Sequence, residues 1–210
     1  MSFDIIKVLE SVGGVIVDDH FVLKSGKHAS KYLNKDALYP HTDLTSQACQ
    51  AFTEKAQDLE YDVVVGPALG GIILSQWTAW HASKQKSKEI YGVYTEKDSN
   101  EDQIFTRGYD KLIKGKKVLV TEDITSTGGS AKSVIDAVTR AGGEVVGVTV
   151  LINRNPSGVN SEYFGVPFYS LGELVVEVYD EQDCPFCAED RPINLNVGHG
   201  RKYVEAKNAN

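Results

Sequence analysis

The sequence predicts an α/β fold in which helices flank a central, mostly parallel sheet. Two features of the pattern lead to this prediction. Short runs of β-branched and other apolar residues alternate with amphipathic stretches of helical period. Several of these runs lead directly into polar or glycine-rich loops, and in a parallel sheet such loops gather at the carboxyl ends of the strands, where ligands bind. The length of 210 residues suits a single domain with one sizeable core.

Bulk composition excludes several classes of function. The net charge of −7 and the isoelectric point near 5.3 argue against a nucleic-acid-binding surface, which needs a basic patch. No apolar run approaches the ~20 residues that cross a bilayer, so we expect no membrane partner. Three cysteines do not make a disulfide framework, and the first residues lack the charged and apolar regions of a signal peptide. We therefore expect a cytoplasmic protein.

The N-terminal part contains a helical pattern and a basic turn. Residues 3–12 place apolar side chains at helical spacing, and two glycines follow that would end the helix. An extended apolar segment at 21–23 leads into a turn over 24–28 with two lysines and a histidine, and 32–34 resumes an extended pattern. A functional site and a solvated hairpin tip explain this turn equally well.

A helix, a strand and a glycine-rich turn follow in that order. Residues 42–59 carry apolar side chains largely on one face, which predicts a helix against the sheet. A short valine strand at 62–66 runs straight into the turn Gly66–Gly71, and a helix is expected over 72–83. Small residues at such a turn allow a ligand to approach the backbone and bind its amides. A close-packed turn without a ligand explains this segment equally well.

A long polar connection follows the strand predicted at 90–94. Residues 95–108 include Lys97 and Arg107 and show hardly any apolar periodicity. Polar connections of this length inside a compact domain are usually functional or mobile. The segment is therefore a candidate lid over a ligand, with a solvated surface hairpin as the alternative.

The most informative stretch is Val118–Ser130, which joins three segments of different character. An apolar run at 118–121 predicts a strand that is buried on both faces. Glu122 and Asp123 follow the run. Residues 125–130 then supply four hydroxyls and two glycines before an amphipathic helix.

A loop of this composition at the start of a helix suits a phosphate monoester. It offers backbone N–H groups, hydroxyl donors and the positive end of the helix dipole. Carboxylates beside it would repel that phosphate, so Glu122 and Asp123 need another partner. A sugar phosphate meets both conditions, because its ring hydroxyls, or a bound divalent cation, can meet the acidic pair. A polar turn with merely solvated carboxylates is the alternative, but it does not require this order of residues.

Chemical groups follow several predicted strands and should therefore share one edge of the sheet. A β-branched run at 144–152 predicts a further strand that ends at Asn153 and Arg154. Two shorter strand candidates follow at 166–171 and 174–178. Because parallel strands end at one edge, we expect four groups to gather there. They are the glycine turn at 66–71, Lys97, the loop at 122–130 and Arg154.

The C-terminal part contains a Cys-x-x-Cys pair. Cys184 and Cys187 could hold zinc, but a tetrahedral site needs a second pair of ligands. The candidates are Cys49, far upstream, and isolated histidines such as His199. A structural turn is therefore favoured over a zinc site, and a redox pair is favoured least because no thioredoxin-like sequence surrounds it.

The order of strand, acidic pair and Thr/Gly-rich loop resembles the signature of the type I phosphoribosyltransferases. Over residues 15–195 the chain is also similar to the orotate phosphoribosyltransferases. Further motifs carry this likeness. They are Phe-x-Leu-Lys-Ser-Gly at 21–26, Gly-Pro-Ala-Leu-Gly-Gly at 66–71, the two parts of a flap at 95–98 and 105–108, and a Cys-Pro-x-Cys tail at 184–187, which occurs in a bacterial subgroup.

This resemblance implies a fold, an activity and an assembly. Residues 1–210 would form one domain of the type I phosphoribosyltransferase fold, with a core at 41–172 and a small hood made of about 1–40 and the C-terminal segment. The activity would be transfer of the 5-phosphoribosyl group from phosphoribosyl pyrophosphate to orotate, which gives orotidine 5′-phosphate and pyrophosphate in pyrimidine nucleotide biosynthesis. Mg²⁺ would be carried on the pyrophosphate. The protein would be a homodimer with shared active sites.

The resemblance also assigns roles to particular residues. The flap cations and the acidic pair would be catalytic: Lys97, Arg107, Glu122 and Asp123. Asp123 is in addition a candidate Mg²⁺ ligand. Orotate would be held by Lys24, the hydroxyl of Ser126 and the guanidinium of Arg154, whose planar fork suits a carboxylate. Phosphoribosyl pyrophosphate would be bound by Gly70, Gly71, Lys97, Glu122, Asp123, Ile124, Thr125, Ser126, Thr127, Gly128, Gly129 and Ser130.

Some positions differ from the family pattern. Family members usually have threonine at the position of Ser126, many have aspartate at that of Asn153, and residues 27–33 replace a more aromatic run. Two other functions therefore remain as alternatives. They are transfer to a purine or related base, and sensing of the sugar phosphate without catalysis. Arg154 favours orotate over a purine, and the flap cations favour catalysis over sensing.

Overall fold

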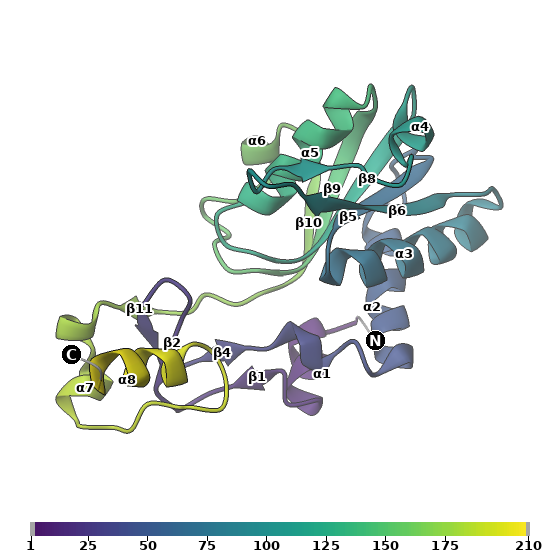
Figure 1. Cartoon of the computed structure of the whole chain (residues 1–210). Helices are drawn as coiled ribbons and strands as arrows, with labels where there is room; N and C mark the ends of the chain where they lie inside the picture. Colours follow the sequence, from purple (N-terminus) through teal and green to yellow (C-terminus); the bar gives the residue numbers. More distant parts are fainter. Residues whose placement is uncertain (1–2, 209–210) are drawn as a thin grey trace.

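The computed structural model describes residues 3–208, and its core is a six-stranded sheet (Figure 1). The strand order is β10-β9-β8-β5-β6-β7, and neighbours are parallel except at the edge, where β7 pairs antiparallel with β6. This architecture confirms the predicted fold class. The strands are β5 (Val63–Pro67), β6 (Tyr91–Lys97), β7 (Gln103–Ile104), β8 (Lys117–Thr125), β9 (Glu144–Asn153) and β10 (Phe168–Glu173).

Helices cover both faces of the sheet because its central strands are apolar on both sides. Val63, Val118 and Val120 pack in one layer with residues of α5, whereas Val64 and Leu119 pack in the other with α3. A pleated strand that is buried on two faces requires this alternation. Among residues 3–208 no helix combines the length and the apolarity needed to cross a bilayer. The helices around the sheet are α1 (Ile5–Ser11), α2 (Thr42–Lys55), α3 (Gly70–Lys86), α4 (Asp110–Ile113), α5 (Gly129–Arg140) and α6 (Ser161–Phe164).

Both ends of the chain meet in a smaller unit, seen in Figure 1 as purple and yellow segments beside one another. Near the C-terminus, β11 pairs antiparallel with β3, and β3 also pairs with β2. We call these three strands the hood sheet: β2 (Phe21–Val22), β3 (His28–Ala29) and β11 (Val178–Tyr179). The neighbouring elements are β1 (Val15–Ile16), β4 (Tyr32–Leu33), the 3-10 helices η1 (Lys35–Ala37) and η2 (Glu181–Asp183), α7 (Pro185–Ala188) and α8 (Gly200–Asn208).

Two strands differ from the prediction in ways that affect the site. The central strand continues beyond the predicted 118–121, because its pairing with β9 extends to Thr125 opposite Asn153. The acidic pair is therefore part of the strand and not of the loop. Residues 174–177 are not in a strand, since the chain leaves the main sheet after Glu173 and crosses to the hood sheet.

Candidate active site

The acidic pair lies at the carboxyl end of β8, in the middle of the sheet. Glu122 and Asp123 are both buried, and β8 pairs with β5 on one side and with β9 on the other. Gly70, the first residue of α3, packs directly against this end. A Cβ atom on Gly70 would lie 2.2 Å from Oδ2 of Asp123, so only glycine allows the start of α3 to approach the carboxylate.

Burial leaves the carboxyl group of Glu122 poorly satisfied. Oε1 accepts a hydrogen bond from the backbone N–H of Asp123 at 3.0 Å, whereas Oε2 is buried and has no partner with hydrogen-bonding geometry among the described residues. Loss of solvation, and then the charge of Asp123, raise the pKa of Glu122 above its ordinary value of 4.5, and the hydroxyl of Ser130 offsets this rise only in part. A ligand hydroxyl or a cation in contact with Oε2 would stabilise the charged form of Glu122.

Two residues that the sequence did not identify hold Asp123. Nζ of Lys35, in η1, lies 3.0 Å from Oδ2 of Asp123, and the hydroxyl of Tyr39 donates to the same oxygen at 3.3 Å. Oδ1 accepts from the backbone N–H of Ile124 at 2.6 Å. Burial, and then the charge of Asp123, raise the pKa of Tyr39, so its hydroxyl stays protonated as a donor. The sequence contains no local motif that marks these two residues, because they reach Asp123 only through the tertiary fold.

The loop between β8 and α5 is open and is shaped by its own hydroxyls. Oγ1 of Thr125 accepts from the N–H of Gly128 at 3.1 Å. Oγ1 of Thr127 accepts from the N–H of Gly129 at 3.4 Å. Gly128 has a φ of +77°, a left-handed conformation that turns the chain directly into the helix. Ser126 and Thr127 are exposed, so the loop and the N-terminus of α5 are accessible to an anion.

The turn after β5 is packed too closely for side chains at two glycines. A Cβ atom on Gly66 would lie 2.3 Å from the carbonyl oxygen of Gly71, and one on Gly71 would lie 2.7 Å from the carbonyl carbon of Gly66. The sequence placed Gly70 and Gly71 in the turn itself, but both belong to the first turn of α3. The close packing therefore holds the first backbone amides of α3 at the same edge of the sheet as the acidic pair.

The polar connection after β6 is a hairpin whose two predicted cations are both paired within it. Lys97 bonds to Glu101, and Nη2 of Arg107 lies 3.3 Å from Oε1 of Glu96. The backbone of Gln103, in β7, bonds to a serine and to an arginine of α5, which anchors the hairpin. In this conformation neighbouring carboxylates neutralise the two cations, which do not bond to the acidic pair.

Lys24 and Arg154, the predicted orotate ligands, come from the hood sheet and from the end of β9. Lys24 is exposed in the turn between β2 and β3. Arg154 is half-buried, and its backbone N–H donates to the carbonyl of Thr125 at 2.8 Å.

The guanidinium of Arg154 is well suited to an anionic ligand. Its Nε is buried and has no hydrogen-bond partner among the described residues. Loss of solvation lowers the pKa of Arg154, so the charged side chain lacks compensation in this environment. A carboxylate would supply both the missing acceptor and the missing charge.

Comparison with known proteins identifies the family of this chain. The family model for the phosphoribosyl transferase domain matches residues 36–169, which include the acidic pair, the loop after β8 and Arg154. A curated orotate phosphoribosyltransferase from Caldanaerobacter subterraneus subsp. tengcongensis is 36% identical over 179 residues, covering 85% of this chain and 88% of that protein. The chain belongs to the orotate phosphoribosyltransferase family. The resemblance inferred from its motifs is confirmed, and with it the class of enzyme.

Solved structures of orotate phosphoribosyltransferases have the same fold. The Mycobacterium tuberculosis H37Rv enzyme in complex with Fe(III) dicitrate is 27% identical and has a TM-score of 0.65, covering 82% of this chain and 97% of that chain. The same enzyme in complex with 5-phospho-alpha-D-ribosyl 1-diphosphate is 25% identical and has a TM-score of 0.54, covering 68% of this chain and 80% of that chain. A structural relative of this chain therefore binds phosphoribosyl pyrophosphate.

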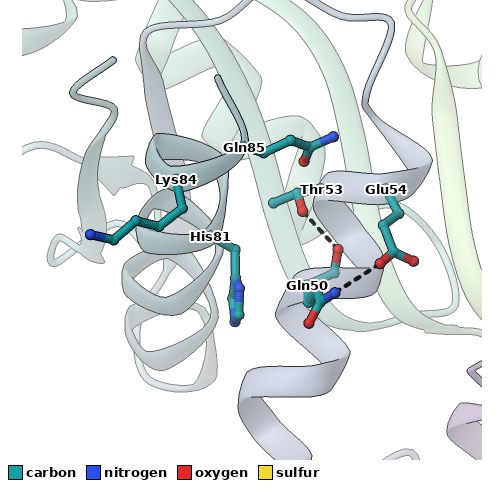
Figure 2. Close-up of a pocket in the computed structure, with 6 residues that line it drawn as sticks. All are labelled: Gln50, Thr53, Glu54, His81, Lys84 and Gln85. Carbon is teal, nitrogen blue, oxygen red and sulfur yellow. Dashed lines mark hydrogen bonds between the residues drawn. The ribbon is translucent and has the colours of Figure 1, made fainter. Parts of the chain in front are cut away.

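A surface pocket between α2 and α3 does not coincide with the substrate residues that the orotate phosphoribosyltransferase resemblance assigns (Figure 2). Two of its side chains bond within α2. Nε2 of Gln50 donates to Oε1 of Glu54 at 3.0 Å, and Oγ1 of Thr53 donates to the carbonyl of Gln50 at 2.7 Å. None of the predicted site residues lines this pocket, whose lining is Gln50, Thr53, Glu54, His81, Lys84 and Gln85.

The state of Glu122 predicts a pH-dependent stability. Its pKa is raised in the folded protein, so above 4.5 the folded protein retains a proton that the unfolded chain has lost. The free energy of unfolding should therefore fall as the pH rises from 4.5 through the raised pKa. Glu122→Gln cannot ionise, so its Tm should exceed that of the wild type by more at about pH 8 than at about pH 5.

Thermal unfolding at both pH values measures this difference. Glu144→Gln, at an exposed position of β9, is the matched control and should show no such trend. An equal Tm difference for Glu122→Gln at the two pH values would contradict the raised pKa.

Proposed function

We propose that this protein transfers the 5-phosphoribosyl group from phosphoribosyl pyrophosphate to a ring nitrogen of orotate, which gives orotidine 5′-phosphate and pyrophosphate in pyrimidine nucleotide biosynthesis. One observation carries the proposal. A buried acidic pair lies near the end of the central strand, and after Thr125 the strand leads into an open hydroxyl loop at the start of α5. This order separates a site for ribose hydroxyls from a site for the 5′-phosphate by a few residues of chain.

The proposed mechanism is mainly electrostatic. Cleavage of the bond at C1 of the ribose builds positive charge on the sugar and negative charge on the pyrophosphate. Glu122 and Asp123 hold the ribose hydroxyls and favour the cationic ring. The amides of Gly70 and Gly71 bind the pyrophosphate, and the loop Thr125–Ser130 binds the 5′-phosphate.

The flap supplies cations to the leaving group in this proposal. Lys97 and Arg107 exchange their carboxylate partners Glu101 and Glu96 for the pyrophosphate, whose charge is greater. The hairpin then covers the substrate and excludes water, which would otherwise hydrolyse the activated sugar. Its anchor on α5 is the fixed end of this movement.

The residues present fit a magnesium ion carried on the pyrophosphate. Oε2 of Glu122 is buried and has no hydrogen-bond partner in the described part of the chain, and the carboxylate of Asp123 is next to it in the strand, so this end of β8 offers the hard oxygen ligands that Mg²⁺ prefers. When bound, Mg²⁺ neutralises charge on the pyrophosphate and so improves it as a leaving group. Asp123 is the candidate protein ligand, in exchange for its ion pair with Lys35.

Orotate is an anion, and the base site we propose matches that charge. Arg154 binds its carboxylate through the guanidinium, whose Nε has no hydrogen-bond partner within residues 3–208. Ser126 donates its exposed hydroxyl to the base, and Lys24 approaches from the hood sheet. A purine has no carboxylate and would leave the half-buried guanidinium unpaired.

We further propose how the chain is organised around this reaction. Residues 41–172 form the catalytic core, and about 1–40 together with the C-terminal segment form the hood that covers the base. The enzyme is a homodimer in which the flap of one subunit contributes to the site of the other. It acts in the cytoplasm, where its free cysteines stay reduced.

Loss of orotate absorbance tests the reaction directly. Purified protein is mixed with orotate, phosphoribosyl pyrophosphate and Mg²⁺, with a chelator and a purine base as separate controls. Magnesium-dependent consumption of orotate is the expected result. Turnover of the purine instead would move the function to another base, and binding of the sugar phosphate without any turnover would identify a sensor.

Asp123→Asn should lower kcat by about 100-fold or more, on the scale of losing one preorganised electrostatic group. The change keeps the size of the side chain and its place beside Gly70, so the fold should be retained. Steady-state kinetics with orotate measure the effect, and Asp136→Asn on the exposed face of α5 is the matched control. Wild-type kcat in Asp123→Asn would refute the role of the acidic pair.

Arg154→Ala should raise the KM for orotate by at least about 10-fold, because a charge-assisted pair is lost. Titration calorimetry with phosphoribosyl pyrophosphate should show little change in its Kd. Arg154→Lys keeps the charge but not the planar fork, so its KM for orotate should lie between that of the wild type and that of Arg154→Ala. Equal weakening of both substrates by Arg154→Ala would place the arginine outside the base site.

Mixing two inactive variants tests the shared sites. Lys97→Ala removes a flap cation, and Asp123→Asn removes the carboxylate of the core. If the flap of one subunit acts in the site of its partner, a mixed dimer regenerates one site with both groups intact, and activity should return after subunit exchange. Dimers that form but stay inactive would show that each site uses its own flap.

A further inference from the structure

Four potential metal ligands converge between the hood sheet and the C-terminal tail. They are His20, His28, Cys184 and Cys187, and their ligand atoms all lie within 4.8 Å of one another. His20, His28 and Cys184 are at most 2% exposed, and Cys187 is partly buried. More than 150 residues separate the histidines from the cysteines in the sequence, so only the fold brings the two pairs together.

The distances between these atoms fit one tetrahedral ion. With zinc–nitrogen bonds of about 2.0–2.1 Å and zinc–sulfur bonds of about 2.3 Å, neighbouring ligand atoms lie about 3.3–3.8 Å apart. Sγ of Cys187 is 3.3 Å from Nδ1 of His28 and 3.8 Å from Nε2 of His20, and Sγ of Cys184 is 3.7 Å from the same Nε2. The two imidazole nitrogens are closer, at 2.7 Å, and would separate by about half an ångström to admit the ion.

The other nitrogen of His20 is already placed as in metal sites. Its Nδ1 lies 2.8 Å from the carbonyl oxygen of Arg191, which can only accept a hydrogen bond. Nδ1 therefore carries the proton, and the lone pair of Nε2 points into the cluster. Metal-bound histidines usually donate their second N–H in this way, which fixes the ring and its tautomer.

The local chain around the cysteines also suits a metal. Cys184 precedes the single helical turn of α7, and the N–H groups of Ala188 and Asp190 bond to the carbonyls of Cys184 and Cys187. This tight turn presents both sulfur atoms toward the histidines. The ring of Phe186 packs against His20, at 5.6 Å between centroids, and shields the cluster from solvent.

We propose that His20, His28, Cys184 and Cys187 form a structural zinc site that fastens the C-terminal tail to the hood sheet. Mixed sulfur and nitrogen ligands in a tetrahedron select zinc among the common metals, and four protein ligands leave no open position for catalysis. Binding releases the two thiol protons and leaves two thiolates on the ion. Because the four atoms surround a single small volume, one ion fits better than an iron–sulfur cluster, whose ligands surround two irons.

The site has a consequence for the substrate region, and this consequence rests on the function proposed above. His20 directly precedes β2, and His28 begins β3, so the two ligands flank the turn that carries Lys24. In Figure 1 the C-terminal helix α8 lies beside β2. Zinc would hold this turn in place, and its removal should raise the KM for orotate more than it lowers kcat.

Metal content and cobalt substitution test the site without reference to activity. The full-length wild-type protein, purified under reducing conditions and passed through metal-free buffer, should retain about one zinc per chain by atomic emission. Replacement by Co²⁺ should produce the visible bands of tetrahedral cobalt and a thiolate charge-transfer band, both of which added Zn²⁺ abolishes. Absence of retained zinc together with absence of these bands would overturn the proposal.

Variants separate this cluster from other cysteines and histidines. Cys184→Ser and Cys187→Ser should lose the retained zinc and the charge-transfer band. Cys49→Ala, at a buried position of α2, and His41→Asn, at an exposed position, should keep both. Zinc retained equally by the double variant of Cys184 and Cys187 would also overturn the site, and if the cysteine variants fail to fold, the cobalt spectrum of the wild type still decides it.

The activity assay keeps the two proposals apart. Zinc binding with turnover of another base would refute the orotate function and leave the metal site standing. Orotate turnover in a protein without zinc or cobalt binding would refute the metal site and leave the orotate function standing. A raised KM for orotate in zinc-depleted protein, restored by added Zn²⁺, would support the link between them.

Discussion

Two adjacent carboxylates are buried near the end of the central strand, where β9 pairs with it, and much of the molecule is arranged around that constraint. Pairing with β9 places Glu122 opposite Val150 and Ile124 opposite Ile152, so the backbone of the acidic pair is held in place and the two charges cannot separate by moving the chain. Burial adds a desolvation cost to their repulsion. The buried pair therefore destabilises the free protein. A ligand that supplies hydroxyls or positive charge to the two carboxylates removes this cost and gains the same free energy in binding.

The structure compensates the two carboxylates in different ways. Asp123 receives Lys35 and Tyr39, which come from η1 and the residues just before α2, whereas one oxygen of Glu122 has no hydrogen-bond partner among residues 3–208. Binding of a ribose at Asp123 would therefore compete with Lys35, and that competition links the substrate to the segment that carries the hood. The ion pair between Lys35 and Oδ2 of Asp123 thus connects the core to a distant part of the chain.

The sequence predicted the parts of the site whose signals are local. The apolar run, Glu122, Asp123 and the loop of hydroxyls and glycines are contiguous, so composition and order alone placed them after a strand and before a helix. The end of that strand was missed because pairing with β9 carries it on to Thr125, and pairing is a property of two segments. Lys35 was missed for the same reason, since nothing near it in the chain indicates an acidic partner 88 residues away.

The hood sheet shows most clearly that the sequence does not reveal pairing between distant segments. Its sheet pairs β11 with β3, an interaction between the two ends of the chain that closes a loop of nearly the whole core. The Cys-x-x-Cys pair was visible in the sequence, but its histidine partners were not identified: His20 was not singled out, and His28 was only part of a predicted basic turn. What the sequence lacked was the pairing of Val178 with Ala29, which carries the tail to that turn.

Strands of two residues each form few backbone hydrogen bonds and close a long stretch of chain, so the hood sheet is weakly stabilised by its own pairing. A cross-link between the N-terminal and C-terminal segments stabilises such a unit most. It joins residues that are far apart in the sequence, and so it removes the most conformational freedom from the unfolded chain. The four ligands come from these two segments. The proposed metal site would therefore hold the turn between β2 and β3 in place in a unit assembled from distant parts of the sequence.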